Sequence, residues 1–424
     1  MTKHLGMLVG IVMVALIVAF AIIVPTTTLA PPQITLTASR MVACPVGDPA
    51  LGQTLVRLTD QQEFSAGLMG ELPGDPVTLA AYDNPAKPVI ARGSATVSGV
   101  SAYTESGHTM IVPCAPPVTS GTWNGVVTRD NSATLILTDV DAAAAVVDVF
   151  LYNQTGPIPI AGLRDITVTA GTPRMLALDQ LAYSDTPISV AIRASRGRVA
   201  ALLRVVGPQG YDWQLPQTSA GTELVIAGVP GGDGARTLSV TNADPTAKAV
   251  VKIQILSQSG PFSPLGIDSF EILPTRTTTI DITQALGGQG SAVQLTSDSP
   301  ITASINVGGP DATAISAQPG LGGTIVIPPI GGMLWFANPT AEQASVTIRW
   351  DDGTMVHPNG LAIPAQSIIS VDLPSNGPSV SISTDTPQVR ASLTLTDASW
   401  SILPLTGGGI ATTVDAPRLD PGLG

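Results

Sequence analysis

The stretch Thr134-Leu135-Ile136-Leu137-Thr138-Asp139 decides the fold, because the chain contains two further copies of its pattern. These copies, at offsets of 103 and then 96 residues, are Thr237-Leu238-Ser239-Val240-Thr241-Asn242 and Met333-Leu334-Trp335-Phe336-Ala337-Asn338. Positions i and i+2 of a strand share a face, so each copy predicts a strand with two buried apolar residues. The predicted buried pairs are Leu135 and Leu137, Leu238 and Val240, and Leu334 and Phe336. The Asp or Asn that ends each copy is predicted to bond the turn that follows.

A second strand follows each copy, and a polar turn follows later in each repeat. The second strands are predicted over 145–152, 249–256 and 344–350. The polar turns are found at 194–198, 296–300 and 383–387, each between two alternating segments. A short turn between two such segments predicts a β-hairpin in every copy. Because order and spacing agree three times, we interpret the copies as structural repeats.

The length of the repeat determines the expected architecture. Beyond residue 32, runs rich in Val, Ile, Leu and Thr alternate with clusters of Gly, Pro, Asn and Asp, which is typical of all-β proteins. A period near 100 residues matches one immunoglobulin-like β-sandwich, so we predict tandem sandwich modules after an N-terminal transmembrane helix. The alternative is a β-propeller with blades of about 40–50 residues, two to each repeat.

The predicted organisation has seven segments. The segments are a signal anchor or transmembrane helix (1–25), a linker (26–34), an N-terminal module with both cysteines (35–121), repeat 1 (122–218), repeat 2 (219–318), repeat 3 (319–405) and a Gly/Pro-rich tail (406–424).

Composition excludes one large class of function. The 424 residues include 19 Lys+Arg and 31 Asp+Glu, for a formal net charge of -12. Neutralising nucleic-acid phosphates needs clustered Lys and Arg, so a general nucleic-acid binder is excluded. Hydrophobic residues make up 44% of the chain, which is enough to give several domains a core.

Residues 5–24 form an uncharged apolar run that predicts a membrane anchor. A helix of about 20 residues, rising about 1.5 Å per residue, spans the hydrocarbon core of a bilayer. Lys3 precedes the run and no basic cluster follows it, which orients the N-terminus inside. We therefore expect a single-pass protein of the cell membrane with an extracytoplasmic C-terminal region. The alternative is a signal peptide cleaved near Ala30, followed by secretion.

Cys44 and Cys114 are the two cysteines of the chain. In an oxidising compartment two cysteines allow one intramolecular pairing, so we predict a disulfide between them. Closing a loop of about 70 residues would stabilise the fold by roughly 4 kcal/mol in the chain-entropy model. Lipidation of Cys44 is the alternative, although the apolar run ends well before it.

The chain resembles an uncharacterised actinobacterial family of secreted or membrane-anchored proteins, a domain-of-unknown-function family. The resemblance is based on the N-terminal span, the two Cys/Pro motifs, Trp123, Gly162-Leu163-Arg164-Asp165 and the stretch from Ala194 to Ala201. It implies an envelope location. It implies no known activity, and no catalytic residue is carried over from it.

The motifs of known enzyme chemistry are missing from the sequence. His4, His108 and His357 are scattered, and the chain has no metalloprotease, nucleophile-elbow or phosphate-loop motif. Asp139 with Asp141, and Asp351 with Asp352, can contribute to a calcium site, but Asp is also a common turn residue. We predict no catalytic residue, no metal site and no cofactor, and expect that the protein is not an enzyme.

One basic cluster departs from the acidic composition. It consists of Arg193, Arg196, Arg198 and Arg204. Guanidinium groups bind phosphate and carboxylate in a forked geometry, which makes the cluster a candidate site for an anionic ligand. The alternative interpretation is a solvated hairpin with dispersed charge.

The leading functional hypothesis is a non-enzymatic, membrane-anchored envelope protein that acts as a scaffold or binding module. Its expected partners are the membrane, through residues 5–24, and an envelope glycan or another envelope protein. One alternative is a carbohydrate-active or other hydrolytic enzyme with unrecognised carboxylates, since such pairs can be distant in sequence. Another is an accessory subunit of an envelope assembly that docks through strand edges.

Overall fold

The computed structural model describes residues 33–36, 40–45, 53–93, 97–105, 108–207, 210–308, 313–351, 356–373, 375, 377, 379–395, 401–405 and 412–415. The chain divides into two compact units, Met1–Thr37 with Ala411–Gly424, and Ala38–Ile410. In the first unit, β1 (Gln33–Leu36) pairs antiparallel with β34 (Thr412–Asp415). These residues fall mainly in the predicted linker and the predicted tail. Both segments nevertheless contain β-branched residues, which favour extended backbone.

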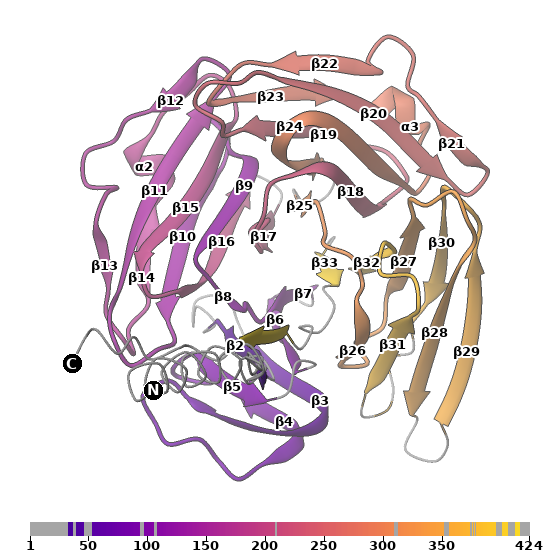
Figure 1. The fold of residues 1–424 in the computed structure, drawn as a ribbon. Helices are drawn as coiled ribbons and strands as arrows, with labels where there is room; N and C mark the ends of the chain where they lie inside the picture. Colours follow the sequence, from indigo (N-terminus) through magenta and orange to yellow (C-terminus); the bar gives the residue numbers. More distant parts are fainter. Residues whose placement is uncertain are drawn as a thin grey trace, which may run out of the picture. The chain divides into compact units, whose positions relative to one another are not determined.

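The second unit holds the remaining described strands (Figure 1). In the N-terminal module these are β2 (Arg40–Cys44), β3 (Gln53–Leu68), β4 (Val77–Asp83), β5 (Val89–Gly93), β6 (Ser98–Glu105), β7 (His108–Pro113) and β8 (Pro117–Val118). Their order is β2-β5-β3-β6-β7, with β4 also on β3. The long strand β3 pairs with β4 and β6 through its first half and with β5 through its end, so it belongs to two sheets.

Repeat 1 forms two antiparallel sheets. Its elements are β9 (Ser120–Val127), β10 (Ser132–Asp139), β11 (Ala145–Asn153), β12 (Gly156–Ile158), β13 (Ile166–Val168), β14 (Arg174–Ala177), α2 (Leu178–Leu181), β15 (Ile188–Arg196), β16 (Val199–Gly207) and β17 (Gly210–Gln214). One sheet has the order β12-β11-β15-β9, with β13 on β11. The other has the order β14-β10-β16-β17, with β8 on β16.

Repeat 2 has the same plan, with one strand shared by its two sheets. Its elements are β18 (Gly221–Val229), β19 (Arg236–Asn242), β20 (Ala249–Ser257), β21 (Gly260–Phe262), β22 (Ser269–Ile272), β23 (Arg276–Asp281), α3 (Thr283–Leu286), β24 (Ser291–Val307) and β25 (Thr313–Ser316). The first half of β24 pairs with β18 and β20, and its second half with β19 and β25.

Repeat 3 forms two separate four-stranded sheets. Its strands are β26 (Gly323–Ile327), β27 (Met333–Asn338), β28 (Ala344–Asp351), β29 (Val356–Ile363), β30 (Ser367–Asp372), β31 (Val380–Thr384), β32 (Arg390–Leu395) and β33 (Ser401–Leu405). The sheet orders are β26-β31-β28-β29 and β30-β27-β32-β33.

The predicted hairpins at the polar turns are wrong. In repeat 1, β15 pairs with β11 and β9, whereas β16 pairs with β10, β17 and β8. In repeat 3, β31 and β32 likewise lie in different sheets. In repeat 2 the segment is the single strand β24, which passes from one sheet into the other. The alternating pattern is correct, but each polar segment carries the chain across the core between two facing sheets.

The buried pairs predicted from the repeated stretch are confirmed. Leu135, Leu137, Leu238, Val240, Leu334 and Phe336 are each 0% exposed. The residue between each pair is on the opposite face of its strand, yet Ser239 is also 0% exposed and Trp335 is 8% exposed. The other face is therefore covered too, because a neighbouring module packs against it.

The residue that ends each copy bonds its turn, as predicted. Asp139 accepts hydrogen bonds from the backbone N–H groups of Asp141 and Ala145. The amide oxygen of Asn242 accepts from the N–H of Asp244, and that of Asn338 accepts from the N–H of Thr340.

Each module has a core between its own two sheets. The core of repeat 1 combines Trp123 of β9 with Leu135 of β10 and Val149 of β11. The cores of repeats 2 and 3 contain Leu238 and Leu334, the counterparts of Leu135. The N-terminal module has a smaller core around Leu58 and Phe64.

Further contacts join consecutive modules. The rings of Tyr103 and Trp213 stack with centroids 5.8 Å apart between the N-terminal module and repeat 1. Between repeats 1 and 2 the contact is polar, and Ser189 accepts hydrogen bonds from Thr241 and Thr277 at 2.9 and 2.8 Å. Between repeats 2 and 3, Trp335 packs with residues of β18 such as Val225 and Ala227.

The last strand of the second unit, β33, returns the chain to the N-terminal module. The hydroxyl of Ser401 on β33 donates to the carbonyl of Ile111 on β7 at 2.7 Å. Ile111 and Val100 of the N-terminal module join the core cluster of repeat 3. Strands β7, β17, β25 and β33, one from each module, contact each other in a closed cycle. Apart from the two four-residue helices α2 and α3, every secondary-structure element of the described residues is a strand, so the all-β prediction is confirmed.

Candidate functional site

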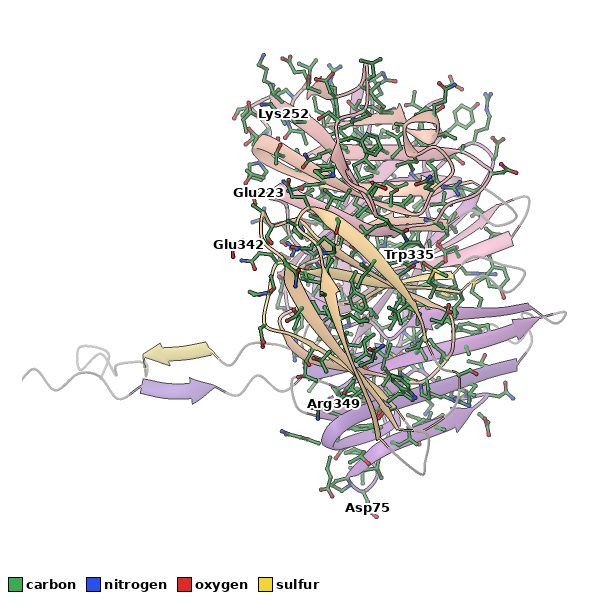
Figure 2. All side chains as sticks on the ribbon, turned by 90° about the vertical axis from the view of Figure 1, so that its right-hand side faces the viewer. Asp75, Glu223, Lys252, Trp335, Glu342 and Arg349 are labelled. Atoms are coloured by element: carbon green, nitrogen blue, oxygen red, sulfur yellow. A yellow bond between two sulfur atoms is a disulfide. The ribbon has the colours of Figure 1, made fainter. Side chains whose placement is uncertain are left out.

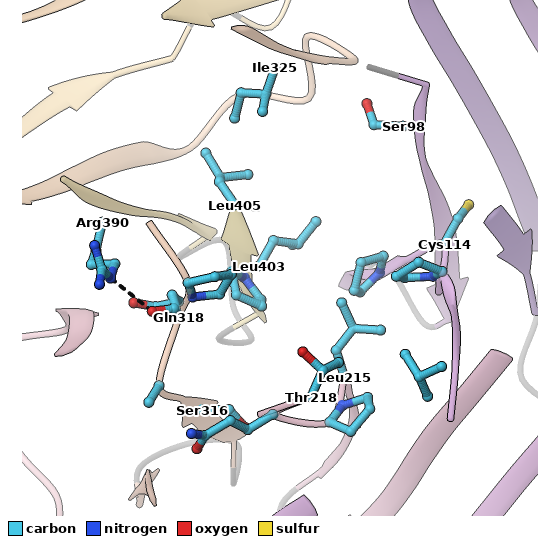
Figure 3. Close-up of a pocket in the computed structure, with 18 of the residues that line it drawn as sticks. Ser98, Cys114, Leu215, Thr218, Ser316, Gln318, Ile325, Arg390, Leu403 and Leu405 are labelled. Carbon is cyan, nitrogen blue, oxygen red and sulfur yellow. Dashed lines mark hydrogen bonds between the residues drawn. The ribbon is translucent and has the colours of Figure 1, made fainter. Parts of the chain in front are cut away.

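A cavity of about 260 Å³ lies where the four modules meet. Figure 3 shows its apolar side chains, among them Leu215, Ile325, Leu403 and Leu405. These residues come from repeat 1 and repeat 3, and further lining residues belong to the N-terminal module and repeat 2. The cavity exists only because the cycle of modules closes.

The segments that connect successive modules form much of the wall. Parts of 113–118, 215–221 and 316–319 line the cavity, and these segments contain or adjoin the predicted module boundaries. Six prolines belong to the lining, namely Pro113, Pro116, Pro216, Pro319, Pro328 and Pro404. Proline fixes φ and has no backbone N–H. The prolines therefore give the wall a fixed shape with few hydrogen-bond donors.

Two glutamine side chains in the wall are used for structure. Gln217 accepts from the N–H of Ala303 at 2.8 Å and donates to the carbonyl of Ser219 at 2.8 Å. Gln318 accepts from the N–H of Ala227 at 2.8 Å and donates to its carbonyl at 3.3 Å. Both amides have partners in the protein, and they hold the connecting segments against the strands of repeat 2.

Arg390 supplies the positive charge of the cavity. It begins β32, and its Nε donates to the carbonyl of Gln318 at 2.9 Å, as Figure 3 shows. Its Nη1 donates to the carbonyl of Gln388. Burial lowers the pKa of the Arg390 guanidinium, and the negative charge of Glu223 opposes this shift. Glu223 is exposed at the surface (Figure 2).

The lining of the cavity is mostly apolar and carries few charges. Among the described residues that line the cavity, Glu223 is the one carboxylate and Arg390 the one cation. General acid–base hydrolysis of a glycoside needs a pair of carboxyl groups. A largely apolar concave wall with few polar groups is typical of a small-molecule binding site. The chemistry that this arrangement supports is burial of an apolar body and contact with one charge.

The predicted disulfide between Cys44 and Cys114 is present, with their Cα atoms 4.1 Å apart. This distance is slightly below the usual range of about 4.4–6.8 Å. Cys44 ends β2 and Cys114 follows β7, so the bond ties two strands of the N-terminal module together. Because Cys114 also lines the cavity, the disulfide fixes one part of its wall.

The four arginines of the basic cluster have different surroundings. Arg193 and Arg196 are exposed on β15. Arg198 donates two hydrogen bonds to Asp141, at 2.9 and 3.0 Å, and these lower the pKa of the Asp141 carboxyl. Arg204 is on β16 of the other sheet, and its guanidinium lies 5.7 Å from the ring centroid of Tyr211. The structure therefore does not arrange the cluster around one ligand.

The candidate calcium residues are used within the fold where the structure describes them. Asp139 bonds its own turn and Asp141 pairs with Arg198. Asp352 lies outside the described residues, and so does the side chain of Asp351. In the part of the chain that the structure describes, no three Cys, His, Asp or Glu side chains converge as metal ligands would.

The proposed membrane span at residues 5–24 lies outside the described residues. Within the described ranges, no helix has the length and apolar character needed to cross a bilayer.

The cavity residues could not be recognised in the sequence. Ser98, Leu215, Ile325 and Arg390 are far apart in sequence and carry no motif. A weak signal was present, because a proline accompanies each connection between modules: Pro116, Pro216 and Pro319. Repeated prolines at equivalent junctions indicate a fixed shared surface, although they do not identify its ligand.

These features define a class of all-β proteins in which four modules enclose a small, mostly apolar cavity. The chain belongs to the family of unknown function DUF5719, whose model matches residues 92–374. No curated protein matches the chain. Among solved structures, the chain has a weak match to the crystal structure of a tetra-tandem repeat in the extending region of a large adhesion protein. That match has 10% identity and a TM-score of 0.11, and it covers 88% of this chain and 100% of the other.

Proposed function

We propose that this is a non-enzymatic binding protein of the cell envelope, with the cavity between its four modules as the binding site. The observation that carries the proposal is the cavity itself, which all four modules line. Its apolar wall, its single cation and its single carboxylate support binding. They do not support the hydrolytic alternative, because a carboxylate pair is not found among the described lining residues.

The architecture that we infer is a closed cycle of paired sheets, nearer to the propeller alternative than to a string of independent sandwiches. The contacts among β7, β17, β25 and β33 support it. The burial of both faces of strands such as β27 supports it too. Each repeat would then contribute two blade-like sheets that share a core.

The location that we propose is the outer side of an actinobacterial cell membrane, with residues 5–24 as the anchor. The uncharged apolar run supports the anchor. The Cys44–Cys114 disulfide supports an oxidising compartment, where such bonds persist. The membrane would be one partner, and an envelope glycan or another envelope protein a second. Intact mass of the protein recovered from membranes tests the anchor, and a mature chain that begins near Pro31 would contradict it.

Native mass spectrometry of the full chain, purified from its own membranes, tests the binding site. We expect a co-purifying small molecule that Ser316→Phe displaces, because half-buried Ser316 lines the cavity and a phenyl ring would fill it. Ser259→Phe is the matched control, since Ser259 is exposed in the turn between β20 and β21. A ligand that both variants retain, or a wild-type chain that carries none, would contradict the proposal.

A further inference from the structure

The surroundings of Arg390 indicate the chemistry of the ligand. Arg390 is half-buried, and its guanidinium donates hydrogen bonds to the backbone carbonyl oxygens of Gln318 and Gln388. No carboxylate of the described residues lies within ion-pair distance of its guanidinium. Carbonyl dipoles stabilise a buried cation only in part, and a carboxylate or phosphate is the group that best matches a guanidinium fork. Arg390 is therefore placed to meet an anionic group in the cavity.

The rest of the cavity wall favours a ligand with an apolar body. Leu215, Ile325, Leu403 and Leu405 surround the space next to Arg390, together with the prolines (Figure 3). Polar groups such as Gln217 and Gln318 already have partners. A sugar has many hydroxyl groups, and an apolar wall would leave these hydroxyl groups without hydrogen-bond partners. Burying unpaired hydroxyl groups costs free energy of binding. At about 260 Å³ the cavity is slightly smaller than the usual range of about 300–1,000 Å³.

We infer that the cavity binds a small amphiphilic carboxylate, with its apolar body among the leucines and prolines and its carboxylate on Arg390. This inference rests on the proposed function and specifies the ligand class of the same site. A single negative charge fits better than a phosphate dianion, because one guanidinium compensates one charge. The carboxylate of Glu223 at the margin of the cavity repels a negatively charged ligand, and it repels a dianion more strongly than a monoanion.

The test measures binding of octanoate to the full chain in lipid nanodiscs by isothermal titration calorimetry, with empty nanodiscs as the blank. Octan-1-ol provides the same apolar body without charge, and octyl phosphate provides the dianion. We expect octanoate to bind about tenfold more tightly than octan-1-ol, the ratio typical of one charge-assisted hydrogen bond. We expect octyl phosphate to bind more weakly than octanoate.

Three variants locate the interaction. Arg390→Gln should abolish the preference for octanoate over octan-1-ol. Glu223→Gln should tighten octanoate binding several-fold and leave octan-1-ol unchanged, and it carries little risk to folding because Glu223 is exposed. Ser316→Phe should prevent binding of both probes, whereas Ser259→Phe should not.

The outcomes separate this inference from the proposed function. Equal affinity for octanoate and octan-1-ol, or an unchanged preference in both Arg390→Gln and Glu223→Gln, would overturn the carboxylate inference. Octanoate that still binds to Ser316→Phe would overturn it as well, because the probe would then occupy another place. If neither probe binds while Ser316→Phe still displaces the co-purified ligand, the ligand class is wrong and the binding site stands.

Discussion

Asp139, Asn242 and Asn338 occupy the same position in the three repeats but use different chemistry. Asp139 accepts two backbone N–H groups with its two oxygens. Asn338 accepts one N–H, and its amide nitrogen contacts three carbonyl oxygens, those of Glu342, Ile363 and Pro364. Asn242 has the same kind of arrangement, with two carbonyl partners. The turn in repeat 1 therefore tolerates a carboxylate, whereas the turns in repeats 2 and 3 require a donor.

Asn338→Asp should reveal this difference. The new carboxylate would face three carbonyl oxygens at a position that is 0% exposed, and we expect a loss of about 3 kcal/mol in the free energy of unfolding at pH 7. Asn153→Asp is the control, since the Asn153 amide donates only to the hydroxyl of Ser184 and the change should cost under about 1 kcal/mol. Urea unfolding measures both, and equal losses would show that the donors are unimportant.

Asp212 should make the stability of the protein depend on pH. It lies on β17 at the contact with β25, where the Thr313 hydroxyl and the Ala314 N–H donate to it. Burial raises the pKa of Asp212 from 3.8 to about 7, although these hydrogen bonds lower it. Between these two values the folded chain keeps a proton that the unfolded chain has lost. The free energy of unfolding should therefore fall as pH rises from about 4 to 7.

Asp212→Asn should remove that dependence, because the amide keeps an acceptor for Thr313 and does not ionise. Relative to wild type, the variant should gain stability as the pH is raised from 5 to 8. Urea unfolding at the two pH values gives the comparison, in which all other titrating groups contribute equally to both proteins. If the free energies of unfolding of wild type and variant changed in parallel with pH, the raised pKa of Asp212 would be contradicted.

Among the secondary-structure elements, β18 depends on a glycine at its contact with repeat 3. Gly228 has φ +75°, and a Cβ there would collide with Ser392 and approach Trp335. Gly228→Ala should therefore cost more than about 3 kcal/mol, through both backbone strain and steric overlap. Gly232→Ala is the matched control, because Gly232 has φ +91° and nothing within 4 Å of the added Cβ. Thermal unfolding should show the control losing only about 1–2 kcal/mol. Similar losses in the two variants would contradict a tight contact.

The sequence predicted individual strands well and their partners poorly. Alternation identified the strands around Leu135 and Val149, because burial on one face leaves a period of two. It did not show that β15 and β16 lie in different sheets, since a short polar turn fits a hairpin and a crossover equally well. It also did not show that Ser239 is buried, because the module that covers it is distant in sequence.

The same limit applied to the candidate site. The basic cluster was found because its arginines are close in sequence, but Arg198 pairs with Asp141 and Arg204 lies on the other sheet. The cavity was missed because Leu215, Ile325 and Leu403 meet only after four modules have assembled. The local signal, a proline at each junction, predicts a fixed turn and carries no information about what it faces.

The closed cycle of modules predicts how the chain unfolds. Leu238→Ala removes a fully buried side chain from the core of repeat 2 and should cost about 2–5 kcal/mol. Because repeat 2 shares contacts with both neighbouring repeats, the loss should shift one cooperative transition of the second unit. Calorimetry together with urea unfolding tests this. A separate early transition for repeat 2, with the rest unchanged, would show that the modules fold independently.

The hydrogen bond between Ser401 and Ile111 spans 290 positions, which has a consequence for biogenesis. The ribosome makes β33 after every other strand of the second unit. A chain exported from its N-terminus, as we propose, would therefore complete the cycle only after residues 401–405 have left the translocation channel. Until then β7 and β25 lack a neighbour, and exposed strand edges with apolar surface are prone to aggregation. Folding dominated by such distant contacts is slow. A chaperone outside the membrane that shields the open cycle would therefore raise the yield of this protein more than that of a string of independent domains.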